Sequence, residues 1–142
     1  MKKPLKFRKI LFIDDDVIIN ILHKRIAEKL NVCDEIEVLT SGVKGLGYLA
    51  ETLNEGNQLP DVVFLDIRMP LMSGFEMLDA WKQLPEYRPS ILKVIILTSS
   101  LEDEDRILAK KYSEVIDFVN KPLTVELFRS LLEHVSEVRT IR

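Results

Sequence analysis

Five short apolar runs, rich in β-branched residues, limit the folds open to this chain more than any other feature. They are "KILFID" (9–14), "EIEVLT" (35–40), "DVVFLD" (61–66), "KVIILT" (93–98) and "VIDFVN" (115–120). Four of them are almost continuously apolar, which is typical of strands that are covered on both faces. The second run alternates, with Ile36 and Val38 inward, and is therefore predicted to lie nearer an edge of the sheet.

Apolar residues at helical spacing fill the gaps between these runs. Helices are expected between Asp16 and Leu30, over 43–53, around 75–81, over 102–112 and after Thr124. The second carries two glycines, and each lowers helix stability by about 1 kcal/mol relative to alanine. Strand and helix alternate in units of roughly 30 residues, the size of a βαβ repeat. The pattern predicts one α/β domain, a doubly wound parallel sheet with helices on both faces.

Length and charge narrow the class of protein further. The chain has 142 residues, enough for one domain with a core, and its net charge of −3 argues against a general nucleic-acid surface. No apolar run approaches the ~18 residues that a membrane span needs. Cys33 is the only cysteine, which fits a reducing, cytoplasmic location. We expect a frayed basic leader over 1–8, the domain over 9–138 and a short tail over 139–142.

Polar side chains stand where four of the predicted strands end. Right-handed crossovers bring the carboxyl ends of parallel strands to one edge, so these side chains are predicted to converge there. The set consists of Asp14, Asp15 and Asp16 after the first strand, Asp66 after the third, Thr98 after the fourth and Lys121 after the fifth.

The chemistry of that set is restrictive. Clustered carboxylates repel one another unless a cation is present, and Mg²⁺ takes one or two carboxylates together with phosphate oxygens. A carboxylate can attack phosphorus to give an aspartyl phosphate. A lysine and a hydroxyl facing the same point can hold the phosphoryl oxygens. The sequence therefore predicts a magnesium-assisted phosphoryl-acceptor site.

Other polar residues have simpler interpretations. Asp16 is expected to be the N-cap of the first helix, and Asp61 a turn residue remote from the site. Residues 103–105 are acidic and fit the exposed first turn of a helix, where the helix dipole favours negative charge. His23 and His134 fall within predicted helices, far in sequence from any strand end, and we propose neither as a ligand or a base.

The segments "ILFIDDD", "VVFLDIRMPLMSG", "VIILTSS" and "DFVNKPL" resemble, in combination and in order, the receiver domain of two-component response regulators. The resemblance extends over about residues 9–138. It implies a flavodoxin-like sheet of five parallel strands in the order 2-1-3-4-5. It also implies that a sensor histidine kinase or a histidine phosphotransfer protein donates the phosphoryl group.

The same resemblance implies a role for each site residue. Asp66 is the phosphoacceptor, and Thr98 and Lys121 contact the phosphoryl group. The Lys121–Pro122 bond is expected to be cis. Thr98 and Phe118 form a switch that changes the surface of the fourth helix, fifth strand and fifth helix. The implied Mg²⁺ ligands are Asp14, Asp15, Asp66 and the backbone carbonyl of Arg68.

Two departures from the family pattern concern turns. Ser73 stands where the turn after the third strand more often carries Asp or Asn, and serine can also support a turn. The segment "KYSEVIDF" lacks the glycine that is common before the fifth strand, which leaves the end of the fourth helix uncertain.

The implied protein is a stand-alone phosphoacceptor of signalling rather than an ordinary enzyme. It is expected to be a monomer or weak dimer that binds a downstream protein or relays the phosphate, with no DNA-binding domain. The alternative is a haloacid-dehalogenase-like phosphatase, in which "FIDDDVI" supplies Asp14 as nucleophile and Asp16 as acid. That alternative leaves Asp66 without a role, and no acidic strand end follows Lys121.

Overall fold

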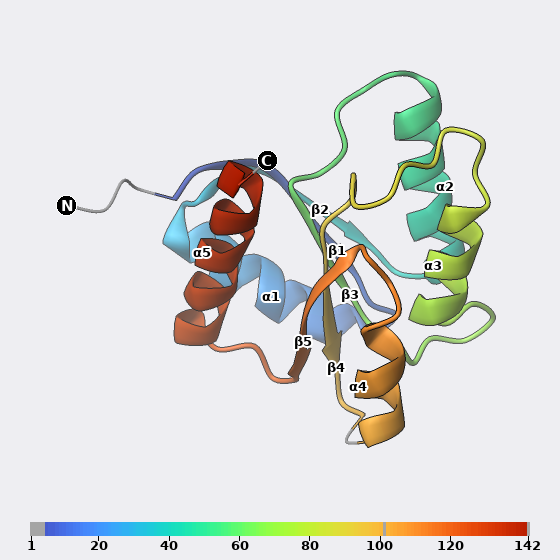
Figure 1. Cartoon of the computed structure of the whole chain (residues 1–142). Coiled ribbons are helices and arrows are strands. Elements are labelled where there is room, and N and C mark those ends of the chain that lie inside the picture. Colours follow the sequence, from blue (N-terminus) through green and yellow to red (C-terminus); the bar gives the residue numbers. More distant parts are fainter. Residues whose placement is uncertain (1–4, 101, 142) are drawn as a thin grey trace.

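The computed structural model describes residues 5–100 and 102–141. Five parallel strands form one sheet in the order β2-β1-β3-β4-β5, as the sequence predicts (Figure 1). The strands are β1 (Phe7–Ile13), β2 (Cys33–Leu39), β3 (Val62–Leu65), β4 (Val94–Thr98) and β5 (Val115–Asn120). The helices are α1 (Val17–Leu30), α2 (Gly42–Asn54), α3 (Gly74–Lys82), α4 (Asp103–Ala109) and α5 (Val125–Ile141).

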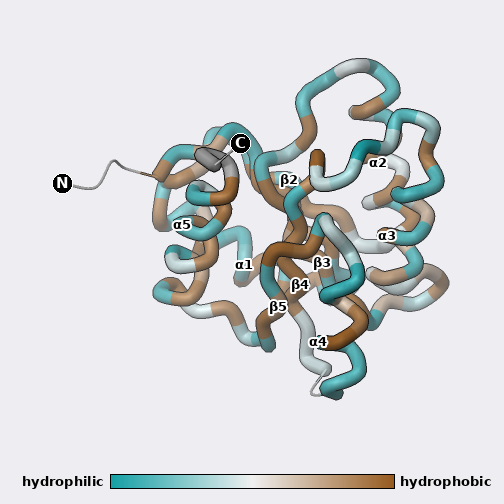
Figure 2. The backbone as a smooth tube through the Cα atoms, viewed as in Figure 1, coloured by the Kyte–Doolittle hydropathy of each residue, from teal (hydrophilic) through white to brown (hydrophobic). Residues whose placement is uncertain are grey.

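Helices cover both faces of the sheet. Helices α1 and α5 lie on one face, and α2, α3 and α4 lie on the other (Figure 1). Each face has its own apolar core, one centred on Phe12, Phe64 and Phe128 and the other on Trp81 and its neighbours. Figure 2 shows the same division, since hydrophobic residues concentrate in the strands between the helical layers. The near-continuous apolar runs of β3 and β4 are thus buried on both sides.

Two glycines allow helices to approach the strands that end at the site. A Cβ on Gly45 would lie 2.5 Å from Cδ1 of Ile13, the last residue of β1. A Cβ on Gly74 would lie 2.5 Å from the carbonyl oxygen of Asp66. The contact at Gly74 is with backbone, so a side chain there would displace the loop that carries Asp66. At Gly45 the end of the Ile13 side chain would have to shift, so the glycine in α2 lets the helix pack closely on β1.

Two strands begin earlier than the sequence analysis predicts. β1 begins at Phe7, so residues 7–8 belong to the sheet and not to the leader. Phe7 is buried, which explains the earlier start; Met1–Pro4 lie outside the described residues. β2 likewise begins two residues early, at Cys33.

The two C-terminal helices also differ from expectation. α4 ends at Ala109, before the expected 112, and the buried Tyr112 ring instead stacks on Phe75 with 5.5 Å between centroids. The backbone of α5 continues to Ile141, through most of the expected tail, because no glycine or proline follows Val125 to end it. Among the described residues, none of the helices combines the length and apolar character needed to cross a bilayer.

Candidate functional site

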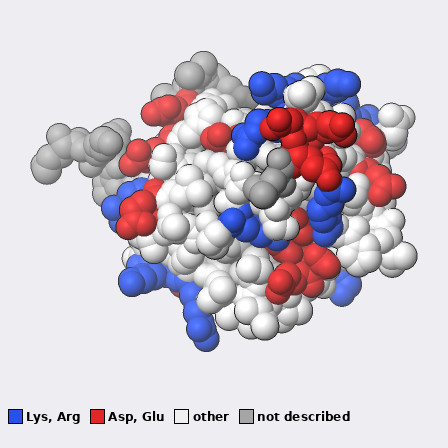
Figure 3. All heavy atoms as spheres, turned by 90° about the horizontal axis from the view of Figure 1, so that it is seen from below, with Lys and Arg blue, Asp and Glu red and all other residues white. Residues whose placement is uncertain are grey.

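Three carboxylates meet at the edge where the strands end, at the bottom of Figure 1. Asp14 and Asp15 follow β1, and Asp66 follows β3, which pairs directly with β1 so that Ile13 lies beside Leu65. One carboxylate oxygen of each lies within 4.8 Å of the others. Asp14 and Asp66 are buried, whereas Asp15 is exposed. Acidic and basic side chains gather near the centre of this face (Figure 3).

Lys121 reaches the same point from the end of β5. Its Nζ lies 2.5 Å from Oδ2 of Asp14 and 3.5 Å from Oδ1 of Asp66. The side chain is only 13% exposed. Its backbone N–H donates to the carbonyl of Thr98 at 2.8 Å, which fixes the loop after β5 against β4. The Lys121–Pro122 bond is cis, as expected.

One ammonium group does not balance three carboxylates. Burial, and then the charge of Asp14, raise the pKa of Asp66 to about 6, although Lys121 and the backbone N–H of Arg68 oppose this shift. A carboxylate that is hard to ionise beside two others indicates a deficit of positive charge. Oxygen ligands around such a deficit suit a hard dication, so Asp14, Asp15 and Asp66 fit the requirements of Mg²⁺.

The third acid of the triplet has a different task. Asp16 caps α1, because its Oδ1 accepts the N–H groups of Ile18 and Ile19 at 3.0 and 3.1 Å. The prediction of an N-cap is confirmed, and Asp16 is not part of the acidic cluster. Asn20, which the sequence reasoning missed, is buried and donates from Nδ2 to the carbonyl of Asp14 at 2.7 Å. Its position four residues after the cap, on the inner face of α1, was the available signal.

Thr98 is fully buried at the end of β4, beside the acidic cluster in the strand order. Its Oγ1 accepts the backbone N–H of Ser100 at 3.0 Å. The carbonyl of Ser100 in turn accepts from Nδ2 of Asn120 at 2.7 Å. The hydroxyl of Thr98 is therefore directed toward the loop between β4 and α4 in this structure.

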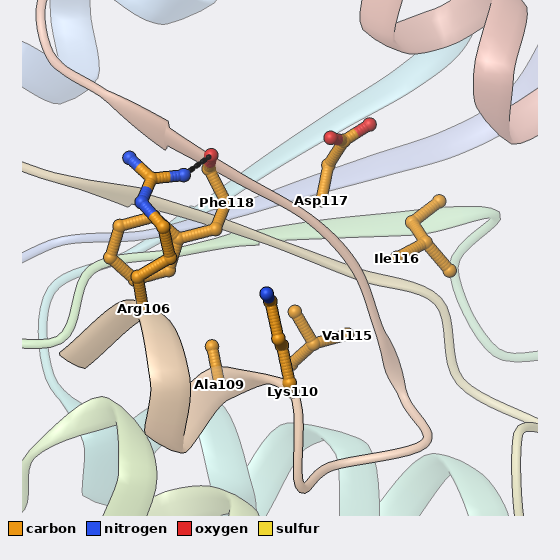
Figure 4. Close-up of a pocket in the computed structure, with 7 residues that line it drawn as sticks. All are labelled: Arg106, Ala109, Lys110, Val115, Ile116, Asp117 and Phe118. Carbon is orange, nitrogen blue, oxygen red and sulfur yellow. Dashed lines mark hydrogen bonds between the residues drawn. The ribbon is translucent and has the colours of Figure 1, made fainter. Parts of the chain in front are cut away.

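Phe118 lies away from the carboxylates, in a pocket of about 320 Å³ between α4 and β5 (Figure 4). The ring is half-buried. The guanidinium carbon of Arg106 lies 4.7 Å from the ring centroid, and Nη1 of Arg106 donates to the carbonyl of Phe118 at 3.4 Å. Arg106 therefore covers the aromatic ring to which the resemblance assigns a switching role.

Both histidines lie outside the site. His23 is buried against Phe12, with 5.7 Å between ring centroids, and burial lowers its pKa to about 4. His134 pairs through Nδ1 with Oδ2 of Asp117 at 2.7 Å. The acidic cluster consists of Asp14, Asp15 and Asp66 and includes neither histidine. Asp61 accepts the backbone N–H of Arg8 at 2.6 Å, at the other end of the strands.

One acidic residue of α4 was misjudged. Asp105 was expected in an exposed first turn, but it is 9% exposed. Its Oδ2 accepts from Nη2 of Arg68 at 2.7 Å and from the hydroxyl of Ser100 at 2.6 Å. The guanidinium of Arg68, which extends from the loop after β3, stabilises the buried charge.

The turn that leads from Asp66 into α3 is well defined. Ser73 caps α3 by accepting the N–H of Glu76 at 3.1 Å, and the Glu76 carboxylate accepts the N–H of Ser73 at 3.0 Å. This reciprocal capping box shows that serine supports the turn. The loop that carries Asp66 is therefore anchored at both ends.

Comparison with known proteins agrees with this geometry. The family model "Response regulator receiver domain" matches residues 10–133. A probable methanogenesis regulatory protein of Methanothrix harundinacea is 33% identical, over 90% of this chain and 81% of that protein. A probable C4-dicarboxylate response regulator of Bacillus subtilis is 26% identical over 92% of this chain, which spans 53% of that protein.

Solved structures show the same relationship. A two-component response regulator from Cytophaga hutchinsonii superposes with a TM-score of 0.83 and 32% identity, covering 93% of this chain and 98% of that one. A CheY-like receiver domain from Methanospirillum hungatei shares the fold, with a TM-score of 0.77, 24% identity and coverage of 96% and 100%. These matches give no support to the phosphatase alternative. The chain belongs to the response regulator receiver domain family of two-component signalling.

Proposed function

We propose that this domain accepts a phosphoryl group on Asp66 in a Mg²⁺-dependent reaction. The donor is a phosphohistidine of a sensor kinase or a histidine phosphotransfer protein. The single observation that carries the proposal is the meeting of Asp66 with Asp14, Asp15 and Lys121 at one point of the strand edge. A buried carboxylate of raised pKa is held there beside a cation and two acids.

The transfer exchanges one bond to phosphorus for another. A carboxylate oxygen of Asp66 attacks the phosphorus, the new O–P bond forms, and the N–P bond of the donor breaks with its electron pair remaining on the imidazole nitrogen. Lys121 is placed to hold a phosphoryl oxygen once it leaves its partner Asp14. The domain thus positions its own acceptor and stabilises the charge that accumulates on the transferred group.

Mg²⁺, when bound, neutralises the acidic cluster and the phosphoryl oxygens. Asp14, Asp15 and Asp66 are the proposed side-chain ligands, and the backbone carbonyl of Arg68 is the proposed main-chain ligand. Lys121 pairs with Asp14, one of the proposed ligands, so the ammonium and the cation would share this carboxylate.

The proposed response is a shift between two states of the surface formed by α4, β5 and α5. A phosphoryl group on Asp66 draws the hydroxyl of Thr98 toward it, and the space that opens admits Phe118. Phe118 must then leave the guanidinium of Arg106, so the pocket between α4 and β5 changes shape (Figure 4). The altered surface binds a downstream protein, or the phosphate is passed on, with the domain acting as a monomer or weak dimer.

Phosphorylation in the absence of any kinase tests the proposal. The protein is incubated with acetyl phosphate and Mg²⁺ and its intact mass is measured. We expect the wild type and Asp16→Asn to gain one phosphoryl group, because asparagine also caps helices and Asp16 lies outside the acidic cluster. Asp66→Asn should gain none. A phosphoryl group on Asp66→Asn at the wild-type rate would overturn the assignment of the acceptor.

A further inference from the structure

A chain of polar contacts joins the loop after β3 to the first turn of α4. Nη2 of Arg68 lies 2.7 Å from Oδ2 of Asp105 and 3.1 Å from Oε2 of Glu102. The Ser100 hydroxyl donates to the same Oδ2 of Asp105 at 2.6 Å. We call Arg68, Ser100 and Asp105 the α4 latch, because they tie this helix to the segment that carries Asp66.

The carboxylate end of the latch is withdrawn from water, whereas the Arg68 side chain is 54% exposed. The side chain of Asp105 is only 13% exposed, and two short hydrogen bonds converge on one of its oxygens. A carboxylate withdrawn from water in this way depends on its partners, and removing one of them weakens the arrangement more than breaking an exposed pair would. The contact with Glu102 is different, since both of its side chains are more than half exposed.

Thr98 connects the latch to the end of β4, the strand that neighbours β3 and Asp66. The backbone N–H of Ser100 donates to Oγ1 of Thr98 at 3.0 Å, and the side chain of the same Ser100 donates to Asp105. If the hydroxyl of Thr98 moves toward a phosphoryl group on Asp66, Ser100 loses its acceptor. Ser100, which donates to Asp105, is then no longer held in place. At the same time Arg68, two residues after Asp66, is attracted by the negative charge of the phosphoryl group.

We propose that the α4 latch stabilises the unphosphorylated arrangement of α4 and that phosphorylation of Asp66 works against it. Arg68, Ser100 and Asp105 are positioning residues that set how readily the domain switches. This inference rests on the proposed function and adds a regulatory element to it. The helix that carries Asp105 also carries Arg106, which covers Phe118, so release of the latch frees the pocket between α4 and β5 (Figure 4).

The first test is the affinity for beryllofluoride, a phosphoryl mimic, measured by calorimetric titration with Mg²⁺ present. If beryllofluoride binds only the switched state, its apparent Kd is the intrinsic Kd divided by the fraction of molecules in that state. Weakening the latch raises this fraction, so binding should become tighter. We expect Asp105→Asn to lower the Kd about fivefold, and Ser100→Ala, which changes no charge, to lower it about twofold. Asp103→Asn is the matched control, since it removes an exposed carboxylate from the same helix.

Arg68→Gln separates the latch from simple electrostatics. The loss of a nearby positive charge alone would weaken the binding of an anion, whereas loss of the latch should tighten it. The proposal is overturned if Asp105→Asn behaves like Asp103→Asn, or if Arg68→Gln and Ser100→Ala both bind beryllofluoride more weakly than the wild type.

A second measurement keeps the latch separate from the proposed function. Hydrogen exchange of the amides of α4 is compared between the unmodified wild type and Asp105→Asn, and we expect severalfold faster exchange in the variant, with Asp103→Asn unchanged. Equal exchange in all three proteins would refute the latch even if phosphorylation occurs. If the wild type fails to bind beryllofluoride while exchange in α4 still accelerates, the proposed function is wrong and the stabilising role of the latch stands.

Discussion

Two carboxylates are buried at opposite edges of the parallel sheet, Asp66 where β3 ends and Glu114 where β5 begins. Glu114 directly precedes β5 and is fully buried. Its Oε2 accepts from the hydroxyl of Tyr87 at 2.8 Å, from that of Ser113 at 3.2 Å and from the N–H of Ser90 at 3.4 Å. Neutral donors of the protein therefore converge on one oxygen of this carboxylate, Oε2, while Oε1 is buried without a hydrogen-bond partner among the described residues. The donors join the connection between α3 and β4 to the sheet.

Asp66 has the opposite surroundings. Its closest charged neighbours are two further carboxylates and one lysine that is nearer to Asp14. Burial and the charge of Asp14 raise the pKa of Asp66, and the opposing effects of Lys121 and the backbone N–H of Arg68 are too small to cancel this rise. The comparison shows that burial of an acid does not by itself indicate a functional site. The distinguishing feature is whether hydrogen-bond donors of the protein converge on the carboxylate, as at Glu114, or further carboxylates surround it, as at Asp66.

The largest expected effect concerns Glu114. Glu114→Ala leaves the Tyr87 hydroxyl and the neighbouring donors without an acceptor and opens a cavity, so we expect a loss of about 2–4 kcal/mol in the free energy of unfolding. Urea denaturation measures it, with the exposed Glu104→Ala as control. Phosphorylation by acetyl phosphate should persist in this variant. If a folded Glu114→Ala protein were no longer phosphorylated, Glu114 would not have a purely structural role.

Asp66→Asn should act in the opposite direction on the metal-free protein. The pKa of Asp66 is raised to about 6 in the fold from an ordinary 3.8, so the folded state binds the proton more tightly. Stability from this group is present below pH 4 and is lost as the pH rises through 6. At pH 7 we expect Asp66→Asn to be more stable than the wild type by roughly 1–3 kcal/mol.

The pH dependence provides the control for this second effect. The advantage of Asp66→Asn should shrink steadily between pH 7 and pH 4 in urea denaturation with a chelator present. A variant that is less stable than the wild type at pH 7 would show that Lys121 already satisfies Asp66, and the contrast with Glu114 would fail.

Magnesium should stabilise the wild type by about 1.4 kcal/mol at ten times its dissociation constant. Asp15→Asn should lose most of this increase, because it removes a carboxylate from the acidic cluster. Asp16→Asn should keep it, because Asp16 is committed to capping α1. Thermal unfolding with and without Mg²⁺ measures the difference, and equal losses in both variants would contradict the assignment of separate tasks.

The smallest effect is expected for Tyr87→Phe. The variant removes one of the three donors to Glu114, from a half-buried side chain, and should lower stability by about 1 kcal/mol. The stabilisation by Mg²⁺ should be the same as in the wild type. A change in the Mg²⁺ response would mean that the two edges of the sheet are coupled.

Much of the acidic site was predictable because it depends on chain order. Asp14, Asp15, Asp66 and Lys121 each follow an apolar run, and parallel strands with right-handed crossovers bring such positions to one edge. Periodicity also predicted the five strands to within about two residues at each end. The N-cap role of Asp16 follows from the position of an acid just before an apolar helical pattern.

Contacts between separate loops were not predictable in the same way. Asp105 looked like an exposed acid of a first turn, and nothing in the local pattern indicated that the side chain of Arg68 reaches it from 37 residues away. Glu114 precedes a strand, as many solvated acids do. Its burial depends on where the loop around Tyr87 folds back, which no periodicity encodes.

The sequence by itself determined the alternation of strands and helices, the edge at which the polar residues gather, and the chemistry that their charges favour. It could do so because the apolar pattern and the handedness of the connections are properties of consecutive residues. The tertiary structure alone decided which charges have partners within the protein and which do not. Side-chain pairing depends on distances of a few ångströms between loops remote in sequence, and only the packing of the helices on the sheet sets those distances.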